Sequence, residues 1–195
     1  MASVGTTEQP PKQEGQIGVN GFFYHFLESG TGCRKVDYNT NGEFVSGSEL
    51  SPVDTAICLY GVIACRQAMT QANGYTSGQE DQIRDRADSM LSRVDWPFLL
   101  NRAMEPQQVY LAWKPEQTAD YVVPHPRGVG YVASTIDGGG HERIFTWDYT
   151  TDEILLIALA GIAAPEPAKR LPLATMESWI RETGTFGGHP VVQSF

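Results

Sequence analysis

The chain has 195 residues, of which 41% are hydrophobic and 19% are charged, so it is long enough to bury a core of its own. Its 23 Asp and Glu residues outnumber its 14 Lys and Arg residues, and the net charge is -9. Such a charge is repelled by phosphate backbones and by anionic lipid surfaces. The composition therefore argues against nucleic acid and against a membrane as partners.

Residues 1–20 are polar and rich in Pro and Gly, a composition that buries too little surface to order itself. They lack the apolar centre of a signal peptide, and no segment reaches the roughly 20 apolar residues of a membrane span. We expect a disordered tail over 1–20 and a single domain over 21–195. Nothing in the chain as given predicts export, and the localisation stays open.

Ser51-Pro52-Val53-Asp54 is the first strong helix signal, because Ser51 can cap a helix, Pro52 suits its first position and Asp54 its third. The helix is expected to run from Pro52 to Met69. Its interior, residues 56–65, is apolar on every face, which predicts that other protein elements surround it. Cys58 and Cys65 would lie about 10 Å apart along this helix, too far for a disulfide.

Three more helices are predicted further along the chain. Apolar residues recur at helical spacing from Ile83 to Val94 with charges between them, as in an amphipathic surface helix. Thr150 to Glu153 resembles a capping box, and Ile154 to Ile162 is again apolar all round. The stripe within Leu173 to Thr183 indicates a second amphipathic helix. We interpret residues 95–147, rich in Trp, Pro and Gly, as a long irregular segment.

Buried and surface helices thus alternate along the chain. A double ring of inner and outer helices requires this alternation. The expected fold class is all-α, with an incomplete ring, because four helices do not close one.

Carboxylates at the two buried-helix starts are the main chemical candidates, namely Glu49 and Asp54 at the first and Asp152 and Glu153 at the second. Glycoside cleavage needs two carboxyl groups, one as acid and one as base or nucleophile. The alternative is that these carboxylates only favour the helix dipole and cap free N–H groups, and spacing alone favours this alternative. The four His residues lack metal-binding spacing, so no metal or other cofactor is expected.

Aromatic residues gather in and beside the irregular segment, among them Trp113 and Trp147. Aromatic faces can stack on sugar rings, although core packing is the commoner role of such residues. Lys114 and Glu116, on either side of Pro115, are more often a solvated pair than a substrate contact.

Several segments together resemble the glycoamylase-like domain family, which includes endo-β-1,2-glucanases and domains of cyclic β-1,2-glucan synthases. The matching segments are Gly21-Phe22-Phe23-Tyr24-His25-Phe26-Leu27, Glu49-Leu50-Ser51-Pro52-Val53-Asp54-Thr55-Ala56, Arg93-Val94-Asp95-Trp96, Trp113-Lys114-Pro115-Glu116, and Trp147-Asp148-Tyr149 followed by Asp152-Glu153. The resemblance implies a partial (α/α)6 toroid. A full family domain is about twice as long, so the resemblance also implies a truncated domain.

The resemblance implies a glycoside hydrolase that acts on a β-linked glucan, of β-1,2 linkage by family. Glu153 would be the general acid, with Asp54 as the second catalytic candidate. The implied substrate-binding residues are Glu49, His25, Trp113, Lys114, Glu116, Trp147 and Asp148. Two alternatives remain open: an inactive glucan-binding or assembly module, and a fragment that does not fold by itself.

Overall fold

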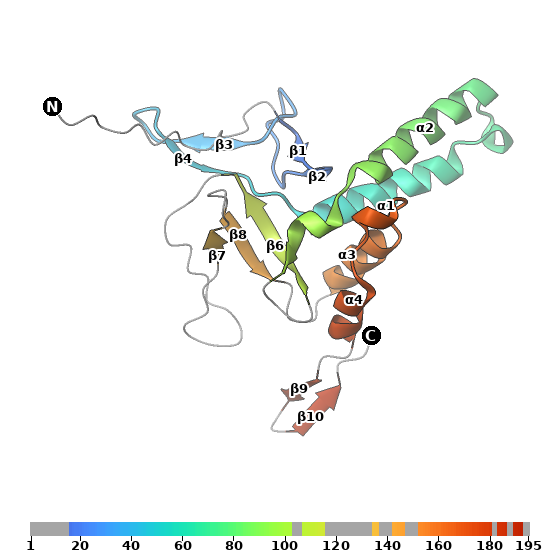
Figure 1. The fold of residues 1–195 in the computed structure, drawn as a ribbon. Helices are drawn as coiled ribbons and strands as arrows, with labels where there is room; N and C mark the ends of the chain where they lie inside the picture. Colours follow the sequence, from blue (N-terminus) through green and yellow to red (C-terminus); the bar gives the residue numbers. More distant parts are fainter. Residues whose placement is uncertain are drawn as a thin grey trace.

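Helices and antiparallel sheets are combined in this protein (Figure 1). The expectation of an all-α fold, as a partial (α/α)6 toroid, is therefore wrong, and the chain is a mixed α and β protein. The computed structural model describes residues 16–102, 107–115, 134–136, 142–146, 152–180, 183–186 and 189–192.

Three of the four α-helices of the described residues begin close to where their sequence signals lie, and the helix predicted from the repeat at Ile83 begins six residues earlier, at Ser77. These helices are α1 (Pro52–Ala68), α2 (Ser77–Arg93), α3 (Asp152–Ile162) and α4 (Leu173–Ile180). Helix α1 packs against α2 and α3, and α3 packs against α4. Figure 1 shows α1 and α2 side by side. Short 3₁₀ helices are η1 (Gln71–Asn73), η2 (Trp96–Leu99) and η3 (Pro167–Lys169).

A direct polar contact joins α1 to α3. The Tyr60 hydroxyl on α1 donates a hydrogen bond of 3.0 Å to the Leu156 carbonyl on α3. Burial between the helices raises the pKa of Tyr60 above its ordinary value, because the charged phenolate would lose its hydration there.

The strands form small antiparallel sheets. One sheet has the order β5-β6-β8-β7, and the pairs β1-β2, β3-β4 and β9-β10 are hairpins. The strands are β1 (Gly18–Val19), β2 (Phe22–Phe23), β3 (Val36–Tyr38), β4 (Phe44–Gly47), β5 (Leu100–Asn101), β6 (Gln108–Lys114), β7 (Ser134–Ile136), β8 (Glu142–Thr146), β9 (Thr183–Phe186) and β10 (His189–Val192).

The four-stranded sheet lies within residues 95–147, so the interpretation of that segment as irregular is wrong for its described parts. Strand β6 has the sequence Gln-Val-Tyr-Leu-Ala-Trp-Lys, rich in the β-branched and aromatic residues that strands favour. Its partner β8 pairs Tyr110 with Thr146 and Lys114 with Glu142. The strand signal is local, but the abundance of Trp, Pro and Gly around it obscures it.

The core lies where α1, α3, β6 and the β1-β2 hairpin meet. Phe22 and Trp96 are fully buried, and their rings meet edge to face with centroids 5.2 Å apart. Other buried members are Leu50, Leu59, Leu99, Val109, Ile154 and Ile157.

Helix α1 buries only part of its apolar surface in the described residues. Ile57 is 53% exposed, and Cys58 and Cys65 are exposed free thiols. Leu159 on α3 is also mostly exposed. The expectation that protein surrounds these helices on every side is therefore wrong for the described part of the chain. An apolar pattern tells which residues tolerate burial, but the number of available neighbours decides which are buried.

Candidate functional site

The β1-β2 hairpin comes directly before the first segment of the candidate site. Asn20 and Gly21 join β1 to β2 and both have positive φ, 50° and 84°, as a two-residue Asn-Gly turn requires. A Cβ on Gly21 would lie 2.5 Å from the Val94 backbone nitrogen, so this position has room only for glycine. The Asp95 N–H donates to the Asn20 carbonyl, at 2.9 Å. These contacts anchor the hairpin to the end of α2.

The chain after β2 pairs with the segment that enters α1. Tyr24 and Leu50 form an antiparallel bridge, and the His25 N–H donates to the Glu49 carbonyl at 2.8 Å. On its other side Leu50 donates to the Trp113 carbonyl of β6, also at 2.8 Å. Because successive side chains of an extended segment alternate in direction, Tyr24 is buried and His25 points outward beside Glu49.

The start of α1 is capped by Ser51, as its sequence predicts. The Ser51 hydroxyl accepts the Asp54 N–H at 3.2 Å, and Pro52 occupies the first turn. The Ser51 N–H donates to the Phe23 carbonyl at 3.0 Å, so Asp54 has no capping bond to return to it. The Asp54 carboxylate instead lies against His25. Capping alone does not account for this carboxylate.

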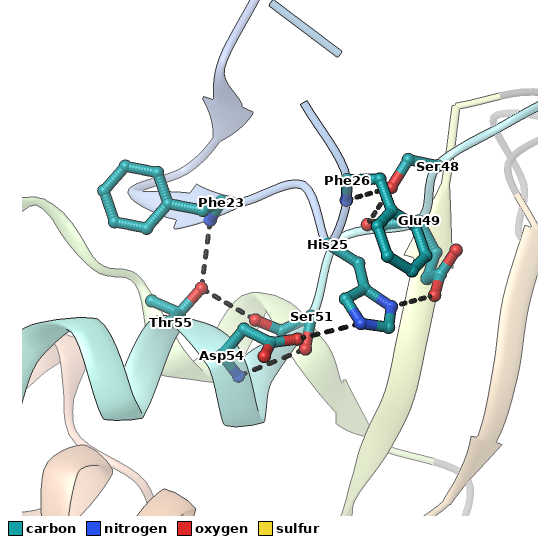
Figure 2. A network of polar contacts seen from close by, with 8 residues as sticks. All are labelled: Phe23, His25, Phe26, Ser48, Glu49, Ser51, Asp54 and Thr55. Carbon is teal, nitrogen blue, oxygen red and sulfur yellow. Dashed lines mark hydrogen bonds and ion pairs between the residues drawn. The ribbon is translucent and has the colours of Figure 1, made fainter. Parts of the chain in front are cut away.

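Three candidate residues, His25, Glu49 and Asp54, lie together at the start of α1 (Figure 2). We call them the acidic histidine cluster. His25 Nδ1 lies 2.8 Å from Glu49 Oε1, and His25 Nε2 lies 3.6 Å from Asp54 Oδ2. The side chains are 40%, 28% and 44% exposed, in the same order. The imidazole ring therefore lies between two carboxylates that both reach solvent.

The two carboxylates interact differently with the imidazole. An ionised carboxylate only accepts hydrogen bonds, so an ionised Glu49 at this distance pairs with the ring form that carries a proton on Nδ1 of His25. A neutral ring would then present a lone pair to Asp54, whereas an imidazolium attracts both carboxylates. The 3.6 Å separation from Asp54 is an ion-pair distance rather than a hydrogen bond. The cluster thus presents two carboxylates on either side of one imidazole, and all three side chains are open to a ligand.

The buried side chain of Thr55 connects the two segments that carry this cluster. Thr55 Oγ1 accepts the Phe23 N–H at 3.0 Å and donates to the Ser51 carbonyl at 2.7 Å. It therefore ties the two segments that carry His25 and Asp54 to each other (Figure 2). Ser48 acts similarly at the other end, where its hydroxyl accepts the Phe26 N–H at 2.7 Å. No local sequence pattern marks the roles of Ser48 and Thr55 in this contact, because the N–H groups that they accept lie 22 and 32 residues away.

The aromatic and basic candidates lie elsewhere. Trp113 is buried in the core, where its ring meets Phe98 with centroids 5.4 Å apart, so its placement favours the packing alternative. Lys114 is half-buried at the end of β6, opposite Glu142. The candidates Glu116, Trp147 and Asp148 lie outside the described residues.

Glu153 lies in the first turn of α3 and is exposed. A carboxylate at this position is favoured by the helix dipole. Among the described residues no hydrogen bond or ion pair joins Glu153 to the acidic histidine cluster. The structure thus brings together three of the predicted residues and leaves the proposed acid on a different helix.

Within the described residues, no group of three or more His, Cys, Asp and Glu side chains is arranged to hold a metal ion. None of the helices in that part of the chain is long and apolar enough to span a membrane.

Comparisons with known proteins return no match: no protein-family model, no curated protein and no solved structure resembles this chain closely enough to align with it. The resemblance to the glycoamylase-like family therefore rests on the sequence segments alone.

Proposed function

We propose that this chain binds a β-linked glucan, of β-1,2 linkage, at the acidic histidine cluster and hydrolyses it by acid/base catalysis. The observation that carries the proposal is the meeting of His25, Glu49 and Asp54, which come from two separate segments and all reach solvent. Carboxylates accept hydrogen bonds from sugar hydroxyls, and the imidazole that lies between the two carboxylates orients these acceptors. The resemblance to glucan-active proteins also supports the proposal, because it implied a role for these three residues from the sequence.

In this proposal Glu49 binds substrate. Asp54 is the second catalytic carboxylate, which acts as base or nucleophile, and His25 positions it. Glu153 would deliver the proton to the leaving oxygen, as its match to the family segment implies. Hydrolysis requires both carboxyl groups to flank one glycosidic bond.

Binding without turnover is the second candidate, and one observation favours it. Glu153 lies in the first turn of α3, on an element separate from the cluster, and no hydrogen bond or ion pair joins it to the cluster in the described residues. A module that kept the cluster but not the acid would bind glucan and leave it intact.

The test uses the purified full chain and linear β-1,2-glucan, with binding followed by calorimetry and hydrolysis by the release of reducing ends. Asp54→Asn should weaken binding about tenfold or more. Glu153→Gln should leave binding unchanged and abolish hydrolysis. If Glu153→Gln hydrolyses glucan normally, the acid is misassigned. Binding without reducing ends would select the second candidate, and no binding at all would overturn the proposal.

Asp88→Asn is the matched control. Asp88 is a half-exposed carboxylate in an ion pair with Arg66 at the far end of α1. Arg66 lies about 18 Å along the helix from Asp54. The same loss of charge there should change neither binding nor hydrolysis.

A further inference from the structure

Phe26 is a large apolar side chain exposed directly beside the acidic histidine cluster. It directly follows His25 in the chain, and its side chain is 55% exposed. Its backbone is held on both sides, because the Phe26 N–H donates to Ser48 Oγ at 2.7 Å and its carbonyl accepts the Lys35 N–H at 3.0 Å. The exposure is therefore a property of a fixed segment.

The Phe26 ring is stacked on the His25 imidazole. The ring centroids are 4.0 Å apart and the planes differ by 20°. One face of the phenyl ring is covered by the imidazole, so the exposed part of the ring is its other face and its edge. Figure 2 shows this ring next to the imidazole that connects the two carboxylates. An apolar face and hydrogen-bonding groups thus lie in adjacent positions.

This combination fits a sugar ring. A β-linked glucose unit presents C–H groups on its faces and hydroxyls around its rim. The negative face of a phenyl ring attracts the C–H groups. Neighbouring carboxylates accept hydrogen bonds from the hydroxyls. Burial against a protein partner is disfavoured here, because interface cores are depleted of charged residues and two carboxylates lie against the adjacent His25.

We propose that Phe26 is the stacking platform of a glucosyl subsite whose hydroxyl contacts come from Glu49 and Asp54. This inference rests on the proposed function and names the subsite within it. His25 has a positioning role, since it fixes the angle of the platform and the separation of the carboxylates together.

The test measures the Kd of a linear β-1,2-gluco-oligosaccharide by calorimetry for four variants of the full chain. Phe26→Ala should raise Kd about tenfold or more. Phe26→Leu, which keeps apolar area but has no ring, should lose a similar amount. Phe26→Trp should bind like the wild type, and its fluorescence should shift when the sugar is added. Tyr38→Ala is the control, because Tyr38 is an exposed aromatic residue on a different element, the β3-β4 hairpin.

The result that overturns the inference alone is a wild-type Kd in Phe26→Ala while Asp54→Asn loses binding. Normal binding by Phe26→Leu would likewise overturn stacking, because apolar area would then suffice. If the wild type itself does not bind the oligosaccharide, the proposed function fails and the inference fails with it. Unchanged thermal unfolding of the variants separates lost binding from lost folding.

Discussion

Single residues decide whether the acidic histidine cluster forms. Thr55 is fully buried, and its hydroxyl is both acceptor and donor between the segments that carry His25 and Asp54. Gly21 permits the backbone of the hairpin to approach Val94 closely. Neither residue belongs to the cluster, but each fixes the backbone of a segment that carries one of its residues.

Replacing Thr55 with Val should destabilise the protein by about 1 to 3 kcal/mol, because the shape is kept while the Phe23 N–H loses its acceptor. Thr55→Ser keeps the hydroxyl and removes one methyl group, which costs about 1 kcal/mol. Urea unfolding of both variants gives the comparison. A Val variant as stable as the wild type would mean that the Phe23 N–H finds another acceptor.

The residue-scale signals divide into local and distant ones. The cap at Ser51 and the Asn20-Gly21 turn can be predicted from adjacent residues, since each acts within four positions of the chain. The contact between His25 and Glu49 spans 24 residues and depends on the Tyr24 and Leu50 bridge. No sequence spacing indicates that distant pairing, so the cluster could only be suggested by resemblance.

At the scale of elements, α1 and α3 have similar apolar sequences but different surroundings. Both contain a glycine within the helix. A Cβ on Gly61 of α1 would meet no atom within 4 Å, whereas a Cβ on Gly161 of α3 would lie 2.4 Å from Leu171 Cδ1. Leu171 is buried, and its N–H donates to the Gly161 carbonyl at 3.0 Å. The glycine of α3 thus permits close packing, while that of α1 only weakens the helix.

Ala substitutions at the two glycines should have opposite signs. Gly61→Ala should stabilise the protein by about 1 kcal/mol through helix propensity. Gly161→Ala gains the same propensity but overpacks Leu171, which should destabilise the protein by about 1 to 3 kcal/mol. Thermal unfolding by circular dichroism measures both. Stabilisation by Gly161→Ala would show that Leu171 can move aside at little cost.

At the scale of the whole molecule, the described core is one-sided. The strands and α3 cover one side of α1, and the opposite side keeps Ile57 and two cysteines exposed. The periodicity of α1 does not distinguish these sides, because both are apolar. The uniform pattern therefore leads to the wrong expectation of burial on every face.

Two neighbouring positions of α1 report which side holds the core. Leu59→Ala should destabilise the protein by about 2 to 5 kcal/mol, because Leu59 is buried and a cavity would remain. Ile57→Ala should change stability by about 0.5 kcal/mol or less, because Ile57 is 53% exposed. Denaturant midpoints of the two variants give the test. A large loss in Ile57→Ala would mean that this face is covered in solution.

The sequence by itself determined the Ser51 cap and the starts of α1, α3 and α4, because these depend on neighbours within a few positions. Only the tertiary structure decided the mixed α and β fold, since the pairing of β6 with β8 joins segments about 30 residues apart. It also decided that Trp113 enters the core while His25, Glu49 and Asp54 meet at the surface. Long-range pairing sets which face of a segment turns outward, and that choice is not encoded in the segment alone.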